Sequence, residues 1–292
     1  MNYRGDIPAN ARLLSIKIFD ENSSYVSQYG VISLLKSVKN RYPQIKIFVL
    51  TICYLQHKGT NESHSTYAYE LDKFAYEHDC LISICTANNH NVQNEITTYD
   101  IGYFNEERTN ICTPADSMNN IIVGAASHSL KPGSHCGIAT GSEFPTLYSR
   151  RSHLDLNLIF SPLKINKHYF RPDVIECGGD FEFNNARSYF GQAEKASMDI
   201  LSANPRKSFY SNIGTSFSAP LVANLAAKIQ SRYPDIRTQS IKALIVNGAS
   251  LEHIRFGEAH EKLTNKVAGH GLVNEERSLN SSDDRITFLI ED

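Results

Sequence analysis

The chain has 292 residues, which is enough for one large or two small domains with a substantial core. Its 41% hydrophobic and 21% charged residues are typical of a folded globular protein and exclude a disordered chain. With 29 Lys and Arg against 31 Asp and Glu, the net charge of −2 provides no basic field for nucleic acid or anionic lipid. The apolar run at 45–53 is interrupted by Lys46 and is far shorter than the roughly 20 residues that span a bilayer.

The six cysteines include no CxxC pair and no Cys/His spacing that is typical of a zinc site. They are Cys53, Cys80, Cys85, Cys112, Cys136 and Cys177. We expect most of them to be buried thiols, three of them in or beside core strands, as in a reducing compartment. No apolar segment follows the first four residues, so the sequence predicts a cytoplasmic protein without a signal peptide.

Strand and helix patterns alternate in the first half of the chain, which is typical of a parallel sheet with crossover helices. Strands are predicted at 11–19, 46–52, 80–86 and 120–126, and helices at 24–41 and 65–77. A long irregular region is predicted from there to about residue 210, followed by helices at 216–232 and 238–247. No composition shift marks a domain boundary before about residue 281.

The most informative segment is SNIGTSFSAP at 211–220, which runs directly into a helical pattern. A serine at a helix N-terminus lies beside free backbone N–H groups and the positive end of the helix dipole, where an oxyanion can be stabilised. Ser216 is therefore a candidate nucleophile, with Gly214 leaving room for substrate and Pro220 in the first turn. An ordinary N-cap serine is the alternative interpretation.

The motif Gly-Thr-Ser-Phe-Ser-Ala-Pro at 214–220 resembles the serine motif of the subtilisin-like serine proteases, the subtilases. The resemblance implies that Ser216 is the nucleophile, and that Asn89 in the Ala-Asn-Asn run at 87–89 is the oxyanion-hole asparagine, with Asn88 at the usual glycine. Further segments resemble the family in the same order, at 5–13, 113–115, 120–125, 171–178 and 269–274.

This resemblance covers about residues 5–280 and implies an α/β fold, a mostly parallel sheet with helices on both faces. We therefore expect a subtilisin-like peptidase domain at 1–280 that is truncated at its N-terminus. Residues 281–292 would begin a C-terminal extension or form a surface strand, because RITFLI at 285–290 alternates apolar and polar residues.

The resemblance also implies an extended peptide or protein substrate that adds to a strand edge. Thr51, Ile52 and Cys53 take the place of the strand that lines the specificity pocket, opposite Gly214 and Thr215. Cys53 is equally compatible with an ordinary buried cysteine at a strand end. No cofactor is expected for catalysis, structural calcium stays open, and no metal site is predicted, because Thr264 stands where a His260-Glu261 zinc helix needs its second histidine.

Two triad residues of the family have no counterpart in the sequence. Subtilases carry the catalytic Asp and His upstream of the segment that resembles 5–13, where this chain has four residues, and no aspartate lies in an Asp-Ser/Thr-Gly context. His57-Lys58-Gly59-Thr60 has one residue more than His-Gly-Thr, and His90 is only a sequence neighbour of Asn89. A serine without a base is a poor nucleophile. The chain is thus either the C-terminal larger part of a peptidase, inactive without a missing N-terminal segment, or a non-catalytic peptide-binding pseudoprotease.

Overall fold

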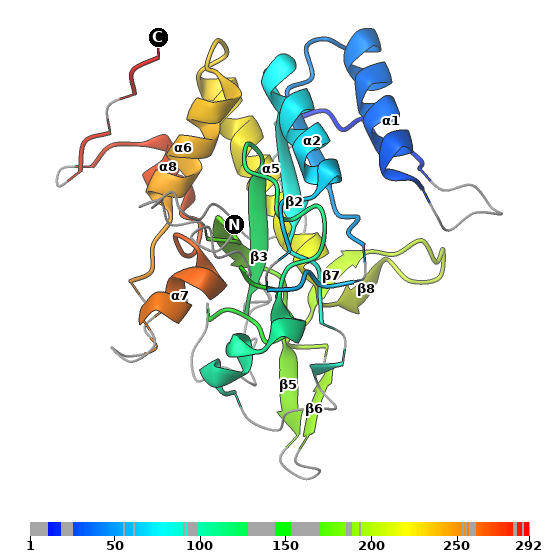
Figure 1. The fold of residues 1–292 in the computed structure, drawn as a ribbon, viewed down its shortest axis with the longest axis vertical. Coiled ribbons are helices and arrows are strands. Elements are labelled where there is room, and N and C mark those ends of the chain that lie inside the picture. Colours follow the sequence, from blue (N-terminus) through cyan, green and yellow to red (C-terminus); the bar gives the residue numbers. More distant parts are fainter. Residues whose placement is uncertain are drawn as a thin grey trace.

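The computed structural model describes residues 11–18, 26–54, 56–60, 62–89, 91–92, 99–127, 144–152, 170–184, 189–192, 194–252, 254, 256, 261–282, 285–287 and 289–291. Its centre is a four-stranded parallel sheet in the order β1-β2-β3-β4 (Figure 1). The strands are β1 Ile47–Leu50, β2 Leu81–Cys85, β3 Ile121–Ala126 and β4 Val174–Cys177. The register pairs Leu50 with Ile84 and Cys85 with Val123, so the strands end at one common edge.

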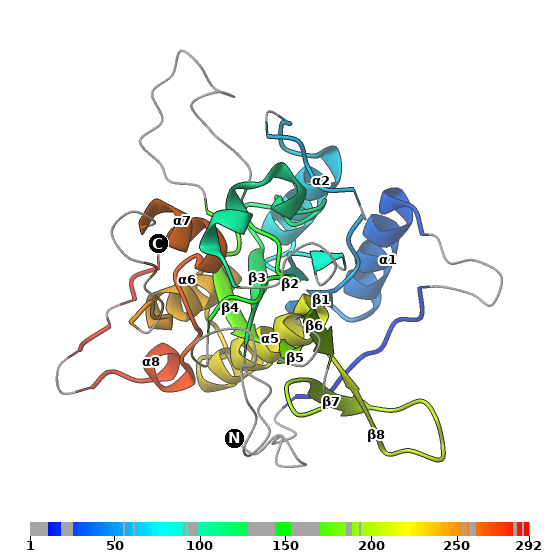
Figure 2. The same ribbon diagram turned by 90° about the horizontal axis from the view of Figure 1, so that it is seen from below.

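Helices cover both faces of this sheet, as the sequence predicts (Figure 2). On one face lie α1, Gln28–Arg41, and α2, Thr66–Glu77, whose first turns are capped by the hydroxyls of Ser27 and Ser65. On the other face lie α5, Thr215–Arg232, and α6, Thr238–Gly248. Side chains alternate between the two cores along each strand, as in a strand that is buried on both sides.

The remaining elements surround this layered centre. Two hairpins are antiparallel, β5 Phe181–Asn184 with β6 Tyr189–Gln192, and β7 Met198–Leu201 with β8 Phe209–Asn212. The short helices are η1 Ile101–Asn105, η2 Glu107–Thr109, α7 Glu261–Ala268 and α8 Glu275–Leu279. Among the helices of the described ranges, none is long and apolar enough to cross a membrane.

Three sequence predictions are wrong in detail. Residues 11–18 form no strand, and Leu13 is 96% exposed, because no neighbouring strand pairs with this segment in the described chain. Residues 285–287 and 289–291 form no strand either, and Ile286 and Ile290 are exposed. The region predicted as irregular contains β4 and both hairpins. Each of their strands has only four residues and therefore gives weak hydrophobic periodicity.

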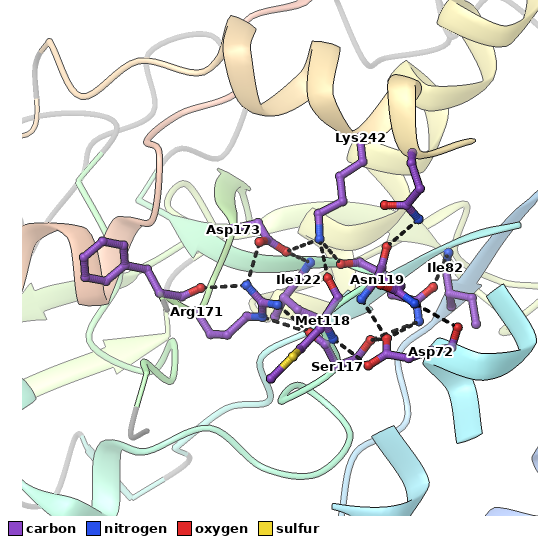
Figure 3. Close-up of polar contacts among 12 residues, drawn as sticks. Asp72, Ile82, Ser117, Met118, Asn119, Ile122, Arg171, Asp173 and Lys242 are labelled. Carbon is purple, nitrogen blue, oxygen red and sulfur yellow. Dashed lines mark hydrogen bonds and ion pairs between the residues drawn. The ribbon is translucent and has the colours of Figure 1, made fainter. Parts of the chain in front are cut away.

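A buried polar network joins the sheet to its helices at the amino ends of the strands (Figure 3). The Asp72 carboxylate on α2 accepts hydrogen bonds from the backbone N–H groups of Met118, at 2.7 Å, and Asn119, at 2.8 Å, just before β3. Asp173, just before β4, accepts from the N–H of Ile122 at 2.8 Å and pairs with Arg171. These bonds hold the amino ends of the strands in place. The opposite edge, at the carboxyl ends of the strands, is where α/β sheets usually bind ligands.

Candidate active site

The site lies at the carboxyl edge of the sheet, where β1 and β2 end and α5 begins. In open α/β sheets this edge is the usual place for ligands and chemistry. The segments that meet there are 51–53 after β1, 85–88 at the end of β2, and 214–216 at the start of α5. The sheet therefore brings the predicted serine motif together with residues more than 100 positions earlier in the chain.

Ser216 occupies the first turn of α5 and is half-buried. Gly214 is the N-cap residue and has no side chain to bond the first turn, so the free N–H groups of the helix need other acceptors. The N–H of Phe217 bonds to the carbonyl of Gly214 at 3.0 Å. Among the described residues, none accepts a hydrogen bond from the N–H of Ser216, which leaves this donor at the positive end of the helix.

Asn88 caps α5 from the neighbouring strand. Its side-chain Oδ1 accepts hydrogen bonds from the backbone N–H of Thr215 and from the Thr215 hydroxyl, both at 3.0 Å. The Nδ2 of Asn88 lies against Gly214, where a Cβ atom would approach it to 3.2 Å. Within the described part of the chain no group accepts a hydrogen bond from Nδ2. The two unbonded donors, Asn88 Nδ2 and the Ser216 N–H, thus lie on either side of Thr215.

The structure gives the Asn89 side chain a hydrogen-bond partner outside the serine motif. The Asn89 side chain is 8% exposed, and its Nδ2 donates to the Tyr103 hydroxyl at 2.6 Å. Its backbone N–H donates to the carbonyl of Tyr148 at 2.7 Å. Asn89 therefore anchors η1, on which Tyr103 lies, and Asn88 is the asparagine in contact with α5.

A left-handed residue explains this shift by one position. Ala87, and not Asn88, adopts a positive φ of 71°. The resemblance places the family's usual glycine at Asn88, and asparagine tolerates the left-handed conformation better than alanine does. With Ala87 in the left-handed region, the next side chain turns toward α5 and the one after it turns away. With two consecutive asparagines, motif matching alone does not decide which of them turns toward α5. The residue type at Ala87 gives no signal that would decide it.

Two thiols lie directly behind the serine. The Sγ atoms of Cys53 and Cys85 are 3.6 Å apart, and the Cys53 thiol donates to the carbonyl of Cys85 at 3.3 Å. The hydrogen bond from Cys53 lowers the pKa of Cys85 to about 7 against the effect of burial, with further hydrogen bonds from Thr215 and Ser216. The same pairing and burial raise the pKa of Cys53. The Ser216 hydroxyl therefore lies next to the Cys85 sulfur.

Of the other predicted substrate-binding residues, Thr51 and Ile52 lie beyond the end of β1 and are half-buried. Ile52 packs against the core under α1 and α2, on the opposite face of the sheet from α5. Cys53, Gly214 and Thr215 lie at the site, because each contacts Cys85 or Asn88. Of the predicted substrate-binding residues, Cys53, Gly214 and Thr215 therefore lie together at the site, and the Ile52 side chain packs on the opposite face of the sheet.

Among the contacts of the four described histidines, none is a hydrogen bond to Ser216. His57 pairs through its backbone with Cys112, and the Nε2 of His64 lies 3.5 Å from Asp72. His78 stacks on Phe74, and the N–H of His270 bonds to the carbonyl of Asp173. His90 and His260 fall outside the described residues. Within the described ranges, no group of three or more His, Cys, Asp or Glu side chains is placed to hold a metal ion.

Chemically, the arrangement offers a hydroxyl in the first turn of a helix with two adjacent N–H donors. Donors held in fixed positions stabilise negative charge that develops on a carbonyl oxygen during attack on its carbon. The described residues do not supply an imidazole or carboxylate that takes the proton of the Ser216 hydroxyl.

Comparison with known proteins agrees with this fold. The model of the subtilase family matches residues 5–276. A protein of Sinorhizobium fredii (strain NBRC 101917 / NGR234), described as uncharacterized protein y4bN, is 26% identical over 263 residues, which cover 85% of this chain and 59% of that protein. The chain thus spans somewhat more than half the length of this curated relative.

Solved structures with a similar fold include two peptide-processing proteases. The prenylagaramide maturation protease PagA matches with a TM-score of 0.54 and 16% identity, covering 90% of this chain and 70% of that one. The epidermin leader peptide processing serine protease EpiP of Staphylococcus aureus matches with a TM-score of 0.53 and 15% identity, covering 93% of this chain and 57% of that one.

Proposed function

Because the chain belongs to the subtilase family, we propose that it is the larger part of a serine endopeptidase domain in which Ser216 is the nucleophile. The observation that carries this proposal is the double hydrogen bond from Thr215 to Asn88 Oδ1. It holds the amide of Asn88 beside the start of α5, with Nδ2 and the Ser216 N–H as the two oxyanion donors.

In the proposed reaction, the Oγ of Ser216 forms a bond to a peptide carbonyl carbon while its proton passes to a base. The carbonyl oxygen takes up the negative charge and accepts hydrogen bonds from Asn88 Nδ2 and the Ser216 N–H. The C–N bond then breaks, the leaving amine receives the proton, and water hydrolyses the acyl ester on Ser216. No cofactor takes part in these steps.

The base is proposed to come from a segment that carries the family's Asp and His and is not among these 292 residues. Two observations support this. The contacts of the four described histidines include no hydrogen bond to Ser216. Moreover, β1 is the edge strand of the described sheet, so its outer edge can pair with a further strand. The chain alone should then be nearly inactive.

The substrate is proposed to be an extended peptide or protein segment, bound along the strand end at 51–53 by backbone hydrogen bonds. The names of the structurally similar proteases, which refer to maturation and to leader-peptide processing, fit a peptide substrate. Cys53, Gly214 and Thr215 would lie next to the scissile bond, because they surround Ser216 and Asn88.

A serine-directed fluorophosphonate tests the proposal, since the probe reacts only when the hydroxyl proton can be removed. The 292-residue chain should label slowly. Co-expression with a segment that contains Asp-Ser/Thr-Gly and His-Gly-Thr, sought in frame or one frameshift upstream of Met1, should accelerate labelling, and Ser216→Ala should abolish it. Fast labelling of the chain alone would show that it contains its own base, and His90→Ala and His57→Ala would locate it. Tight peptide binding without labelling in any form would support a pseudoprotease instead.

A further inference from the structure

The Cys53–Cys85 pair has a geometry that the proposed hydrolysis does not need. Cys85 is the last residue of β2 and is 2% exposed, whereas Cys53 lies beyond the end of β1 and is half-buried. Their sulfur atoms are 3.6 Å apart, and a disulfide needs a separation of about 2.05 Å. Since Cys53 lies outside the hydrogen-bonded part of β1, a side-chain adjustment on its side can close this gap.

The surroundings of the pair favour thiolate chemistry. Hydrogen bonding with the Cys53 thiol is the main cause that lowers the pKa of Cys85 to about 7, and the Ala87 N–H and the Ser216 hydroxyl contribute less. The other thiols nearby differ. Burial raises the pKa of Cys80, and raises that of Cys112 to about 11. Cys85 therefore has the lower pKa in comparison with Cys80 and Cys112.

We propose that Cys53 and Cys85 are a redox-active dithiol beside Ser216, which hydrogen peroxide or a small-molecule disulfide oxidises to a reversible disulfide. With peroxide, one thiolate sulfur attacks an oxygen atom, the O–O bond breaks and hydroxide leaves, which gives a sulfenic acid. The second sulfur attacks the first, the S–O bond breaks and a second hydroxide leaves. Two thiols and one peroxide become one disulfide and two waters, with two electrons transferred to the peroxide.

The disulfide would change the immediate environment of Ser216. In the reduced pair, the Cys85 sulfur lies 3.6 Å from that of Cys53, and the nearby Ser216 hydroxyl contributes to the lowered pKa of Cys85. Oxidation removes the thiolate charge and draws this sulfur toward Cys53. It also links the segment after β1, where the substrate is proposed to bind, covalently to the end of β2. The redox state of the pair is therefore coupled to the position of the serine hydroxyl.

Mass spectrometry of the full 292-residue chain tests the proposal without any assay of hydrolysis. The reduced protein is treated with hydrogen peroxide or oxidised glutathione, its remaining thiols are alkylated, and it is digested. Before alkylation, we expect the mass of the intact oxidised protein to be lower by two hydrogen atoms. After digestion, we expect a linked pair of peptides that contains Cys53 and Cys85. Dithiothreitol should reverse both changes fully. Cys53→Ser should abolish the linkage, while the matched variant Cys80→Ser should retain it.

The wild-type chain alone can overturn the proposal, so a variant that does not fold leaves the test intact. Three results of oxidation would refute the proposal. They are the absence of a linked peptide, a link from Cys85 to Cys112 or Cys136, and an alkylated Cys53 beside a Cys85 sulfinic acid. None of these outcomes depends on whether Ser216 is a nucleophile. Failure of this inference is therefore distinguishable from failure of the proposed peptidase function.

Discussion

Asn88 at the end of β2 accepts two hydrogen bonds from Thr215 at the start of α5, although the two residues are 127 positions apart in the chain. One asparagine therefore performs two tasks with its two ends. Its Oδ1 caps a helix that has no side-chain cap of its own, and its Nδ2 stays unbonded among the described residues. The two tasks can be separated by substitution.

Asn88→Asp keeps an acceptor for Thr215 and replaces the Nδ2 donor by an oxygen. In a form of the protein that labels with fluorophosphonate, we expect this variant to lower the labelling rate by about 10²- to 10³-fold, as for the loss of one oxyanion donor. Asn89→Asp is the matched control, because the amide of Asn89 bonds to Tyr103 and makes no described hydrogen bond to the serine motif. It should change the melting temperature and leave the labelling rate within a few-fold. Slow labelling of Asn89→Asp together with nearly unchanged labelling of Asn88→Asp would show that Asn89 is the oxyanion donor.

Ala87 lies in the left-handed region, where a Cβ atom is unfavourable. We expect Ala87→Gly to raise the free energy of unfolding by about 0.5–1 kcal/mol, since the relief of strain exceeds the added freedom of the unfolded chain. Ala75→Gly, in the buried face of α2, should lower it by about 1 kcal/mol or more. Asn88→Gly should also destabilise the protein, because it removes the cap of Thr215. Chemical denaturation measures all three, and stabilisation by Asn88→Gly alone would refute the observed register.

Asp180 is buried at 2% exposure with a hydrogen bond from the N–H of Phe181, and burial raises its pKa to about 8. The pKa of an unfolded aspartate is about 3.9. Between about pH 4 and pH 8 the folded chain therefore binds one proton more than the unfolded chain, so the free energy of unfolding falls as the pH rises.

Asp180→Asn removes this dependence. We expect the stability of the variant relative to wild type to rise by roughly 2–4 kcal/mol between pH 4.5 and pH 8.5. Asp235→Asn, at an exposed position, should show a constant difference over the same range. Denaturation curves at several pH values decide the matter, and parallel pH profiles for wild type and Asp180→Asn would contradict it.

Asp72 shows the opposite behaviour. Burial tends to raise its pKa, but hydrogen bonds from His64, Ser117 and the N–H groups of Met118 and Asn119 lower it overall. Its stabilising contribution is therefore present above the unfolded pKa of about 3.9 and is lost as the pH falls through the lower folded value. Asp72→Asn should cost about 2–4 kcal/mol at pH 7, since it places an amide donor against other donors.

The destabilisation by Asp72→Asn should shrink in acid, where the wild-type carboxylate is protonated as well. Thermal unfolding at pH 7 and near pH 3 measures this. Asp235→Asn again serves as the control. A cost that stays the same at both pH values would show that the effect is one of packing and not of the charge in the network of Figure 3.

Periodicity and motif together predicted much of this molecule. The alternation of apolar segments gave the first three sheet strands, the helices on both faces and the helix that carries Ser216, because each buries a large and regular apolar surface. β4 was missed as a strand, since it has four residues and depends on β3 for its hydrogen bonds. The motif at 171–178 nevertheless indicated its family position.

The fine geometry of the site needed the structure. Whether Asn88 or Asn89 turns toward α5 depends on the φ of a single preceding residue, and the sequence-based preference for asparagine over alanine at positive φ gave the wrong answer. The approach of Cys53 to Cys85 depends on the register of two parallel strands, which no spacing along the chain encodes. Both features arise from tertiary contacts between segments more than 30 residues apart.

Helix α5 packs against all four strands of the central sheet, yet it follows the last of them in the chain. On a ribosome that adds roughly 5–20 residues per second, the 127 residues between Asn88 and Thr215 take about 6–25 s to synthesise. Throughout that interval the sheet face that α5 covers has no partner, and its apolar residues are open to chaperones, aggregation or proteases. The nascent chain is thus most vulnerable before the residue that would make it a protease has been translated.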